Sequence, residues 1–329
     1  MNSFKEVYEV INKHNNIVIT THLVPDGDAI GSVMSMYYFL KKKNKNPIVI
    51  NHSPTPSNFK FLDPGIIKVF PDNQEENEKI INECDMILVM DTNEYSRTKS
   101  MESILRNSPK PKVCIDHHMG INDKDFTAYI SDTSYPANCQ LLFDFYSLID
   151  ESLIDDKIAT LLYAGIMTDT GGFRFPRTDA KTFSTAAELI KKGADPVEIY
   201  DKIFGNTSLK KLRLIGRFIE GLEFFNEGKL CLGYVTRKDF DELNLAEDDM
   251  EGLSGYTMDI DKVRAGIVVV ELKVGIKLSF RSKGNIDMNG FAKEFNGGGH
   301  KNASGARIYD MNLEQVKERI LALKDKYIQ

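Results

Sequence analysis

Three potential metal ligands lie within one short loop near the start of the chain. His22, Asp26 and Asp28 occur in the segment THLVPDGDAIGS, between an apolar β-branched run and a helical pattern. Imidazole and carboxylate groups are common ligands of divalent cations. A purely structural role is the alternative, because aspartate is a frequent helix cap and Asp28 directly precedes a helical pattern that begins at Ala29.

Similar residues follow other apolar segments of the sequence. They are Asp91, Asp116, His117, His118 and Asp169. The first follows the run MILVM, the Asp-His-His triplet follows the run KVCI, and the last ends an apolar helical segment shortly before two glycines. Each position could also be a cap, a turn residue or a helix stop. Two adjacent histidines among only six in the chain make the triplet the least ordinary of these features.

The elements that must position these side chains alternate along the N-terminal part. Apolar runs predict strands over residues 17–21, 47–50, 86–90 and 112–115, and helical patterns predict helices over residues 29–43, 137–149, 156–168 and 180–192. Strands that alternate with helices predict a parallel sheet, whose ligand crevice lies at the carboxyl ends of the strands. We therefore expect four carboxylates and at least two imidazoles to gather at this edge.

Such a cluster of like charges would repel itself without a counterion. Two divalent cations would offset four carboxylates, which otherwise raise one another's pKa values. Mixed Asp and His ligands without Cys favour manganese, with iron, cobalt and zinc as alternatives. Two-metal sites suit the hydrolysis of phosphate esters, because the ions generate hydroxide and stabilise charge on the phosphoryl oxygens.

The composition indicates an ordinary globular protein with two domains. The chain has 329 residues, of which 42% are hydrophobic and 27% charged. A net charge of −6 disfavours a broad cationic face for long duplex nucleic acid. The four cysteines lack CxxC spacing, which predicts reduced thiols rather than a zinc ribbon or a disulfide framework. No window approaches a membrane span and the first residues lack the apolar stretch of a signal peptide, so we expect a cytoplasmic protein.

A second, smaller domain is expected after Gly193. Residues 1–193 would form the metal-binding domain, and residues 194–221 read as a helical connector without a strand. Strand-like segments return at residues 230–235 and 263–280, which predicts a separate α/β domain over residues 222–329.

In these motifs the chain resembles the DHH phosphoesterase family, which is named after the triplet Asp-His-His. Four family motifs occur in order, as HLVPDGDA from His22, Asp91-Thr92-Asn93, the triplet itself, and Thr168-Asp169-Thr170-Gly171. Downstream, FRS from Phe280 and GGGH from Gly297 resemble the substrate-binding signature of the DHH-associated C-terminal domain. Length and motif set are most similar to the stand-alone group of oligoribonucleases and pAp phosphatases, where pAp is 3′-phosphoadenosine 5′-phosphate.

The resemblance implies two metal ions, most simply Mn²⁺. The ligands implied for one ion are His22, Asp26 and Asp91. Those implied for the other are Asp28, Asp91, His117 and Asp169, so Asp91 would bridge the pair. The resemblance also implies that His118 faces the scissile phosphate and that Asp116 orients the two imidazoles from behind.

In the second domain, the resemblance implies a phosphate-binding glycine run. The implied substrate-binding residues are Arg264, Arg281, Gly297, Gly298, Gly299 and His300. Glycines allow backbone N–H groups to approach a phosphate closely, and arginines offer forked donors. An ordinary turn and surface salt bridges are the alternatives. Two departures from the family pattern, Val24 and Asn296, leave the metal ligands intact.

The implied function is metal-dependent hydrolysis in the cleft between the two domains. Short oligoribonucleotides would yield mononucleotides, and pAp would yield AMP. A phosphodiesterase for cyclic-di-AMP or its linear product pApA is the first alternative, and a non-catalytic nucleotide sensor is an alternative of another class. Implied partners are these small substrates and a second copy in a homodimer, with neither a membrane nor long duplex nucleic acid.

Overall fold

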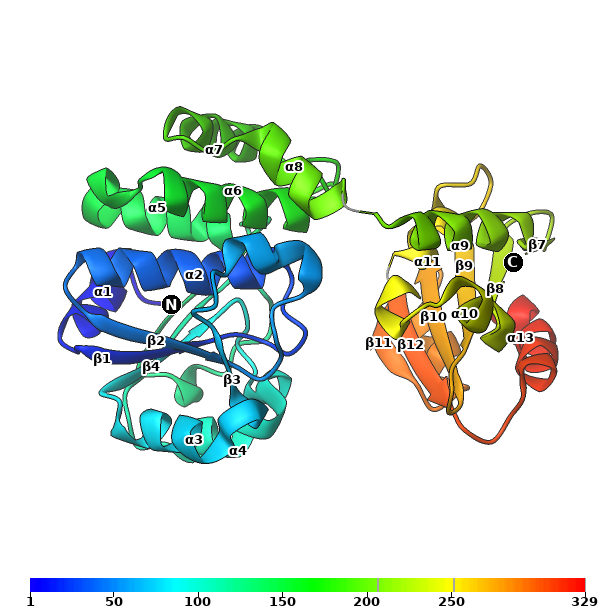
Figure 1. Ribbon diagram of the computed structural model, residues 1–329, viewed down its shortest axis with the longest axis horizontal. Helices are drawn as coiled ribbons and strands as arrows, with labels where there is room; N and C mark the ends of the chain where they lie inside the picture. The colour runs from blue at the N-terminus through cyan, green and yellow to red at the C-terminus, as the bar shows by residue number, and fades with distance from the viewer. Residues whose placement is uncertain (206, 251, 329) are drawn as a thin grey trace. The chain divides into compact units, whose positions relative to one another are not determined.

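The computed structural model describes residues 1–205, 207–250 and 252–328, which fall into two units (Figure 1). Unit 1 comprises Met1–Asn206 and unit 2 comprises Thr207–Gln329. No helix among the described residues is both long and apolar enough to span a membrane.

Unit 1 is built on a six-stranded parallel sheet with the order β3-β2-β1-β4-β5-β6. The strands are β1 (Asn16–Thr20), β2 (Asn46–Asn51), β3 (Lys68–Val69), β4 (Met86–Met90), β5 (Lys112–Asp116) and β6 (Ala128–Ser131). The parallel α/β fold predicted from the alternating pattern is confirmed, although the short strands β3 and β6 were not predicted. The chain leaves β1 toward β2 and returns to its other side as β4, so strand order reverses between β1 and β4. Ligand crevices of open α/β sheets lie at such a reversal.

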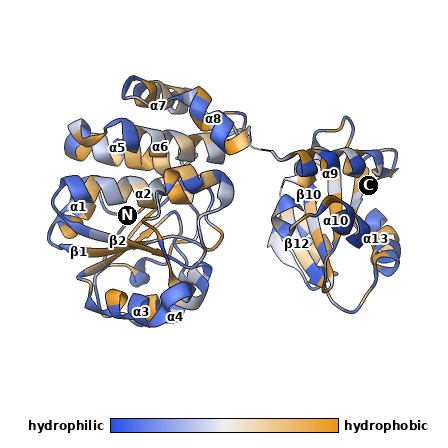
Figure 2. Ribbon diagram, viewed as in Figure 1, coloured by the Kyte–Doolittle hydropathy of each residue, from blue (hydrophilic) through white to orange (hydrophobic). Residues whose placement is uncertain are grey.

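Helices cover both faces of this sheet, which explains why β4 is apolar at every position (Figures 1 and 2). Met86, Leu88 and Met90 pack into one core, and Ile87 and Val89 into the other. The first core lies under α1 (Phe4–Asn12), α2 (Gly27–Lys42), α5 (Asn138–Asp150) and α6 (Asp156–Asp169). Helices α3 (Gln74–Glu83) and α4 (Glu102–Asn107) cover the second. Helix α7 (Ala180–Lys191) packs on α6, on the side of the first core.

Helices α2 and α6 approach closely because glycines lie between them. A Cβ atom on Gly31 would lie 2.6 Å from the carbonyl oxygen of Leu161. A Cβ atom on Gly165 would lie 2.7 Å from Oδ1 of Asp28 and would overlap the Cys139 side chain. The backbone contact therefore fixes the position of Asp28 relative to α6.

We expect Gly165→Ala to lower the free energy of unfolding by about 1–3 kcal/mol, because the added methyl group overpacks this contact. The same change should weaken metal binding by displacing Asp28. Gly216→Ala is the matched control, since Gly216 is exposed in α9 (Leu209–Glu220) with no described atom within 4 Å of its Cβ position. That control should gain up to about 1 kcal/mol from helix propensity. Denaturant unfolding followed by circular dichroism measures both, and a Gly165→Ala protein as stable as wild type would contradict the prediction.

Unit 2 contains a six-stranded sheet with the order β11-β12-β10-β9-β8-β7, antiparallel except between β8 and β9. The strands are β7 (Glu223–Phe225), β8 (Leu230–Val235), β9 (Ala265–Glu271), β10 (Ile276–Ser282), β11 (Gly298–His300) and β12 (Ala303–Ile308). Residues of α9, α10 (Arg237–Leu243) and α11 (Leu253–Met258) pack in one core. Residues of α12 (Met288–Lys293) and α13 (Leu313–Tyr327) pack in the other.

The described residues of the helical segment predicted over 194–221 contain no strand, and the structure divides this segment between the two units. Ile199 and Ile203 of α8 (Pro196–Phe204) pack into the core of unit 1. Leu214 and Phe218 of α9 pack into the core of unit 2. Each helix is amphipathic, so each needs a core of its own to cover its apolar face.

Candidate active site

The predicted acidic and histidine residues of unit 1 come together at the carboxyl edge of its sheet. His22 follows β1, Asp91 follows β4 and His117 follows β5. Asp26 and Asp28 lie at the start of α2, and Asp169 is the last residue of α6. Ligand atoms of three trios lie within 4.8 Å of one another. The trios are His22 with Asp26 and Asp91, Asp28 with His117 and Asp169, and Asp91 with His117 and His118.

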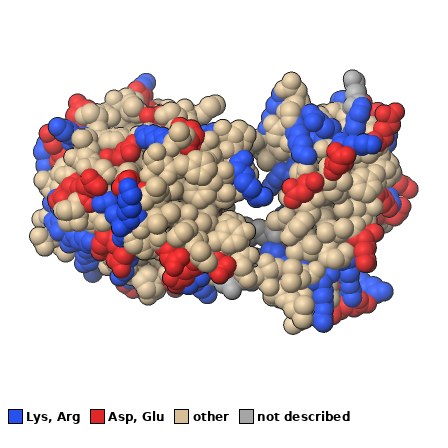
Figure 3. All heavy atoms as spheres, turned by 90° about the horizontal axis from the view of Figure 1, so that it is seen from above, with Lys and Arg blue, Asp and Glu red and all other residues tan. Residues whose placement is uncertain are grey.

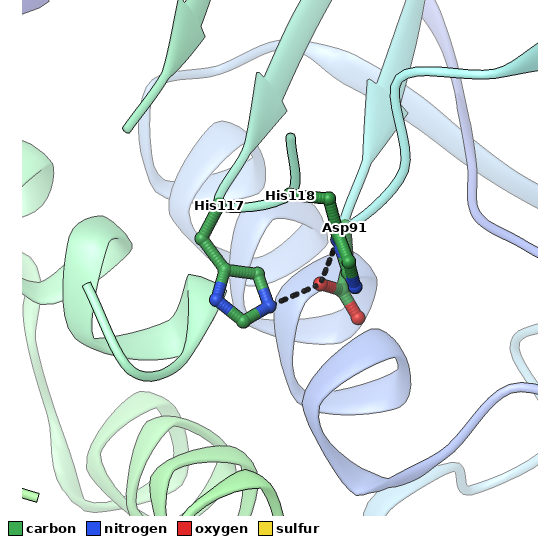
Figure 4. A group of neighbouring side chains, drawn as sticks. All are labelled: Asp91, His117 and His118. Carbon is green, nitrogen blue, oxygen red and sulfur yellow. Dashed lines mark ion pairs between the residues drawn. The ribbon is translucent and has the colours of Figure 1, made fainter. Parts of the chain in front are cut away.

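Asp91 lies at the centre of the cluster and turns a different oxygen toward each side. Its Oδ1 is 3.3 Å from Nε2 of His117 (Figure 4). Its Oδ2 is 3.6 Å from Nε2 of His22. The carboxylate is 2% exposed, and its Oδ1 accepts no hydrogen bond from the described residues. The backbone at Asp91 adopts a φ of 55°, an uncommon conformation that turns the chain sharply after the strand.

Asp28 is held from behind by the start of α5. Its two carboxylate oxygens accept the backbone N–H groups of Asn138 at 2.6 Å and Cys139 at 2.9 Å. Its Oδ2 lies 3.8 Å from Nε2 of His117, whose Nε2 is also 3.4 Å from Oδ2 of Asp169. Backbone donors at a helix N-terminus stabilise a carboxylate and fix its orientation.

Asp116 holds the ring of His118, whereas the resemblance implies that it orients both imidazoles. Its Oδ1 accepts Nδ1–H of His118 at 2.8 Å, and its Oδ2 accepts the side-chain amide of Asn93 at 2.7 Å. The Asn93 amide also reaches the carbonyl of His118 at 3.2 Å. Asn93 belongs to the Asp91-Thr92-Asn93 motif, but the sequence did not predict that its side chain bonds to both Asp116 and His118.

His117 is oriented instead by a backbone carbonyl. Its Nδ1–H donates to the carbonyl oxygen of Tyr135 at 3.1 Å, and this leaves Nε2 directed at the carboxylates. Arg177 donates to the same carbonyl. No sequence pattern pointed to Tyr135, because a carbonyl acceptor can come from any residue. The hydrogen bond selects the tautomer that a metal-binding histidine needs.

The charges within the cluster shift the pKa values of its members. Burial alone would lower the pKa of His117, but its close contact with the Asp91 carboxylate and the charges of Asp28, Asp91 and Asp169 raise it to about 10. Burial and neighbouring carboxylates raise the pKa of Asp169 to about 6 and that of Asp28 well above its usual range. Burial would also raise the pKa of Asp91, but the adjacent imidazoles of His117 and His22 lower it overall.

The residues present fit divalent metal ions. Four carboxylates and three imidazoles converge in the trios, and the buried Oδ1 of Asp91 accepts no hydrogen bond from the part of the chain that the structure describes. Oxygen and nitrogen donors of this kind suit manganese and related ions. One trio consists of the three residues that the resemblance implies for one ion, and the trio with Asp169 contains three of the four implied for the other. The fourth, Asp91, has its Oδ1 3.3 Å from Nε2 of His117. The assignment of ligands to ions stays a prediction.

We expect metal affinity to increase with pH. Metal binding requires neutral histidine and ionised carboxylates. With a pKa of about 10, His117 in the free protein must lose its proton on binding, so about one proton or more should be released near pH 7.5. The number of protons released on metal binding should increase toward pH 6, where Asp169 is partly protonated in the free protein. Titration calorimetry with manganese in two buffers of different ionisation enthalpy measures this release, and identical heats in both buffers would contradict it.

In unit 2, Gly297 and Gly298 of the glycine run line a pocket of about 650 Å³ together with Arg281. Gly298–His300 form strand β11 rather than the alternative of a turn, and pair with β12. A Cβ atom on Gly299 would lie 2.7 Å from the carbonyl oxygen of Ala303, so only glycine permits this close pairing. Asn296 precedes the run with a φ of 55°, which asparagine tolerates better than most residues. His300 is exposed on the same strand.

Arg264 does not share this pocket. It precedes β9 and lines a separate pocket, whereas Arg281 lies on β10. In the antiparallel pair of β9 and β10, Arg281 lies opposite Gly266, two residues after Arg264.

Comparisons with known proteins cover almost the whole chain. The family models "DHH family, N-terminal domain" and "DHHA1 domain" match residues 16–166 and 228–329. The structure of an exopolyphosphatase-related protein from Bacteroides fragilis is 31% identical, with a TM-score of 0.93 over 98% of this chain and 96% of that chain. The chain belongs to the DHH family.

Two relatives of this DHH protein have named activities. The bifunctional oligoribonuclease and PAP phosphatase NrnA of Bacillus subtilis is 29% identical over 321 residues, which cover 96% of each chain. The cyclic-di-AMP phosphodiesterase GdpP of the same organism is 25% identical over 334 residues, which cover 98% of this chain but 49% of GdpP.

Proposed function

We propose that this DHH protein is a metal-dependent hydrolase that converts short oligoribonucleotides to mononucleotides and pAp to AMP. The observation that carries the proposal is the central carboxylate of Asp91, which directs one oxygen toward His22 and the other toward His117. Similarity to NrnA over 96% of both chains supports the choice of substrate.

The ligand assignment is part of this proposal. His22, Asp26 and Asp91 would hold one ion, and Asp28, Asp91, His117 and Asp169 the other. Two Mn²⁺ ions match the donor set and offset four carboxylates. When bound, such ions lower the pKa of a shared water and stabilise charge on the phosphoryl oxygens.

His118 is the residue of the triplet that can reach a substrate. Its side chain is 41% exposed, whereas that of His117 is 3% exposed. Because Asp116 accepts the Nδ1–H bond, Nε2 of His118 remains available for a phosphate oxygen or a leaving group. The hydrogen bond to Asp116 thus holds the ring in one orientation before substrate arrives.

Small substrates fit the charge distribution. The chain carries a net charge of −6, and basic and acidic side chains are interspersed over the face of each unit shown in Figure 3. Binding of long nucleic acid depends on many phosphate contacts from lysine and arginine. In unit 2, the glycine pocket with Arg281 would hold one phosphate of the substrate, with His300 nearby on the same strand.

Initial rates with manganese on pAp, pApA, a five-nucleotide RNA and cyclic-di-AMP test the proposal. Rapid turnover of pAp and the RNA is the expected result, and an Asp116→Ala, His117→Ala double variant provides the blank. Preference for cyclic-di-AMP or pApA would favour the activity suggested by the likeness to GdpP. Tight nucleotide binding without turnover of any substrate would instead indicate a sensor.

A further inference from the structure

A short segment of unit 1 supports two of the expected metal ligands through its backbone. This β6–α5 segment, residues 132–139, leads from β6 into the first turn of α5. The carbonyl oxygen of Tyr135 accepts Nδ1–H of His117, and the first two N–H groups of α5 donate to the carboxylate of Asp28. A shift of the segment would therefore move both ligands together.

Arg177 fastens the β6–α5 segment from another part of the chain. Its Nη2 donates to the carbonyl oxygen of Thr133 at 2.6 Å and also to that of Tyr135. A carbonyl oxygen has two lone pairs, so the Tyr135 oxygen accepts from Arg177 and from His117 at the same time. Hydrogen bonds from a charged donor are roughly twice as strong as those between neutral groups. One guanidinium group thus holds two peptide groups of the segment.

The turn that carries Arg177 starts at a third expected ligand. Asp169 is the last residue of α6, and residues 170–178 form the turn that follows it directly. The turn is anchored to α6, because the buried hydroxyl of Thr170 donates to the carbonyl oxygen of Ile166 at 2.6 Å. Arg177 therefore joins the turn beside Asp169 to the segment that supports the other two ligands.

We propose that Arg177 is a positioning residue for the metal ion of Asp28, His117 and Asp169. The inference rests on the proposed function, which assigns these three residues, with Asp91, to one of two ions. Arg177 acts through the backbone, because it ties the segment that orients two of the ligands to the turn that follows the third. Loss of a group that orients metal ligands from behind typically lowers metal affinity by about 10–100-fold.

The other expected ion has supports of its own. Nδ1–H of His22 donates to the carbonyl oxygen of Leu23 at 2.9 Å, and Asp26 accepts N–H groups from the first turn of α2. Within the part of the chain that the structure describes, neither side chain hydrogen-bonds to Arg177 or to the β6–α5 segment. Removal of the guanidinium group should therefore weaken the binding of one ion and leave the other unchanged.

Manganese affinity in two matched backgrounds tests this selectivity. His22→Asn leaves the ligand set that contains Asp169, and Asp169→Asn leaves the set that contains His22. By titration calorimetry, Arg177→Met should raise the manganese Kd about tenfold in the His22→Asn background and less than about twofold in the Asp169→Asn background. Arg177→Lys retains the charge and a donor, so it should recover most of the lost affinity.

Hydrogen–deuterium exchange gives a readout that needs neither metal nor turnover. The N–H groups of Asn138 and Cys139 are buried and donate to Asp28. Measured with EDTA, their exchange should be about tenfold faster in Arg177→Met, because the segment opens more easily without its charged hydrogen bonds. Far-UV circular dichroism should match that of wild type, since Arg177 is exposed and packs in neither core of unit 1.

Arg174→Met is the matched control. Arg174 lies in the same turn, but its Nε donates to the carbonyl oxygen of Gly171 within that turn, at 2.9 Å. The change removes the same charge from the turn without releasing the β6–α5 segment. We therefore expect the manganese Kd in both backgrounds and the exchange rates to stay within about twofold of the values without this change.

Three results would overturn the inference. One is an unchanged manganese Kd in the His22→Asn background, and another is an equal increase in both backgrounds, which would mean a general effect on unit 1. The third is the same loss in Arg174→Met, because the effect would then come from charge rather than from the bonded carbonyl groups. Failure of the proposed function is a separate outcome, since wild type would then hydrolyse neither RNA nor pAp while the affinities and exchange rates still measure the role of Arg177.

Discussion

Asp91→Asn should reduce kcat by roughly a thousandfold or more, about 4 kcal/mol of transition-state stabilisation. Asparagine has nearly the same shape and tolerates the left-handed backbone that Asp91 adopts at a φ of 55°. The change therefore removes the negative charge shared between His22 and His117 without a new steric demand. Initial rates on pAp at saturating manganese measure the effect on kcat, and calorimetry should show that fewer ions bind.

The control for this experiment is Asp132→Asn. Asp132 follows β6 at the same edge of the sheet, and its Oδ1 accepts the N–H group of Ser134 at 2.9 Å. An asparagine oxygen can accept that same hydrogen bond, so kcat should stay within about twofold of wild type. An Asp91→Asn protein with wild-type rates would show that Asp91 does not unite the two trios, and the two-ion proposal would fail.

The sequence predicted the edge of the sheet at which the cluster forms because parallel strands impose it. Apolar runs fix the strands, and a residue that follows a run must lie at its carboxyl end. This rule alone predicts that His22, Asp91 and His117 lie close together. Their relation to Asp28 also depends on the close approach of α2 and α6, which Gly31 and Gly165 permit.

The sequence pattern did not predict the contacts that depend on backbone atoms or on strand register. Tyr135 acts on His117 through its carbonyl oxygen, so its side chain carries no signal of that role. The glycine run forms β11 although glycine has low strand propensity, because close pairing with β12 excludes side chains there. Arg264 and Arg281 line different pockets, and the sequence pattern contained no information on how the β9–β10 register would separate them.

Replacement of His118 should separate catalysis from metal binding. His118 lies 3.8 Å from Oδ1 of Asp91, so by distance alone it could be a third imidazole ligand. Its exposure and its Nδ1–H bond to Asp116 instead favour a role toward substrate. We expect His118→Asn to lower kcat by about 10²–10⁴-fold, as removal of a general acid or base does, while manganese affinity changes less than threefold. For His117→Asn we expect the reverse, with a large decrease in manganese affinity as the main effect.

Two further variants complete this argument. Asp116→Asn retains an acceptor for Nδ1–H but loses the charge, so a decrease in kcat of about 10–100-fold is expected, typical of a residue that positions a catalytic group. His52→Asn is the matched control, because His52 follows β2 at the same edge and bonds to Ser100 instead of the cluster. If His118→Asn lost manganese as readily as His117→Asn, His118 would be a ligand, and the proton transfer proposed for it would have to come from another group. Retention of metal with loss of turnover would place His118 at the substrate, in agreement with the exposure of its side chain.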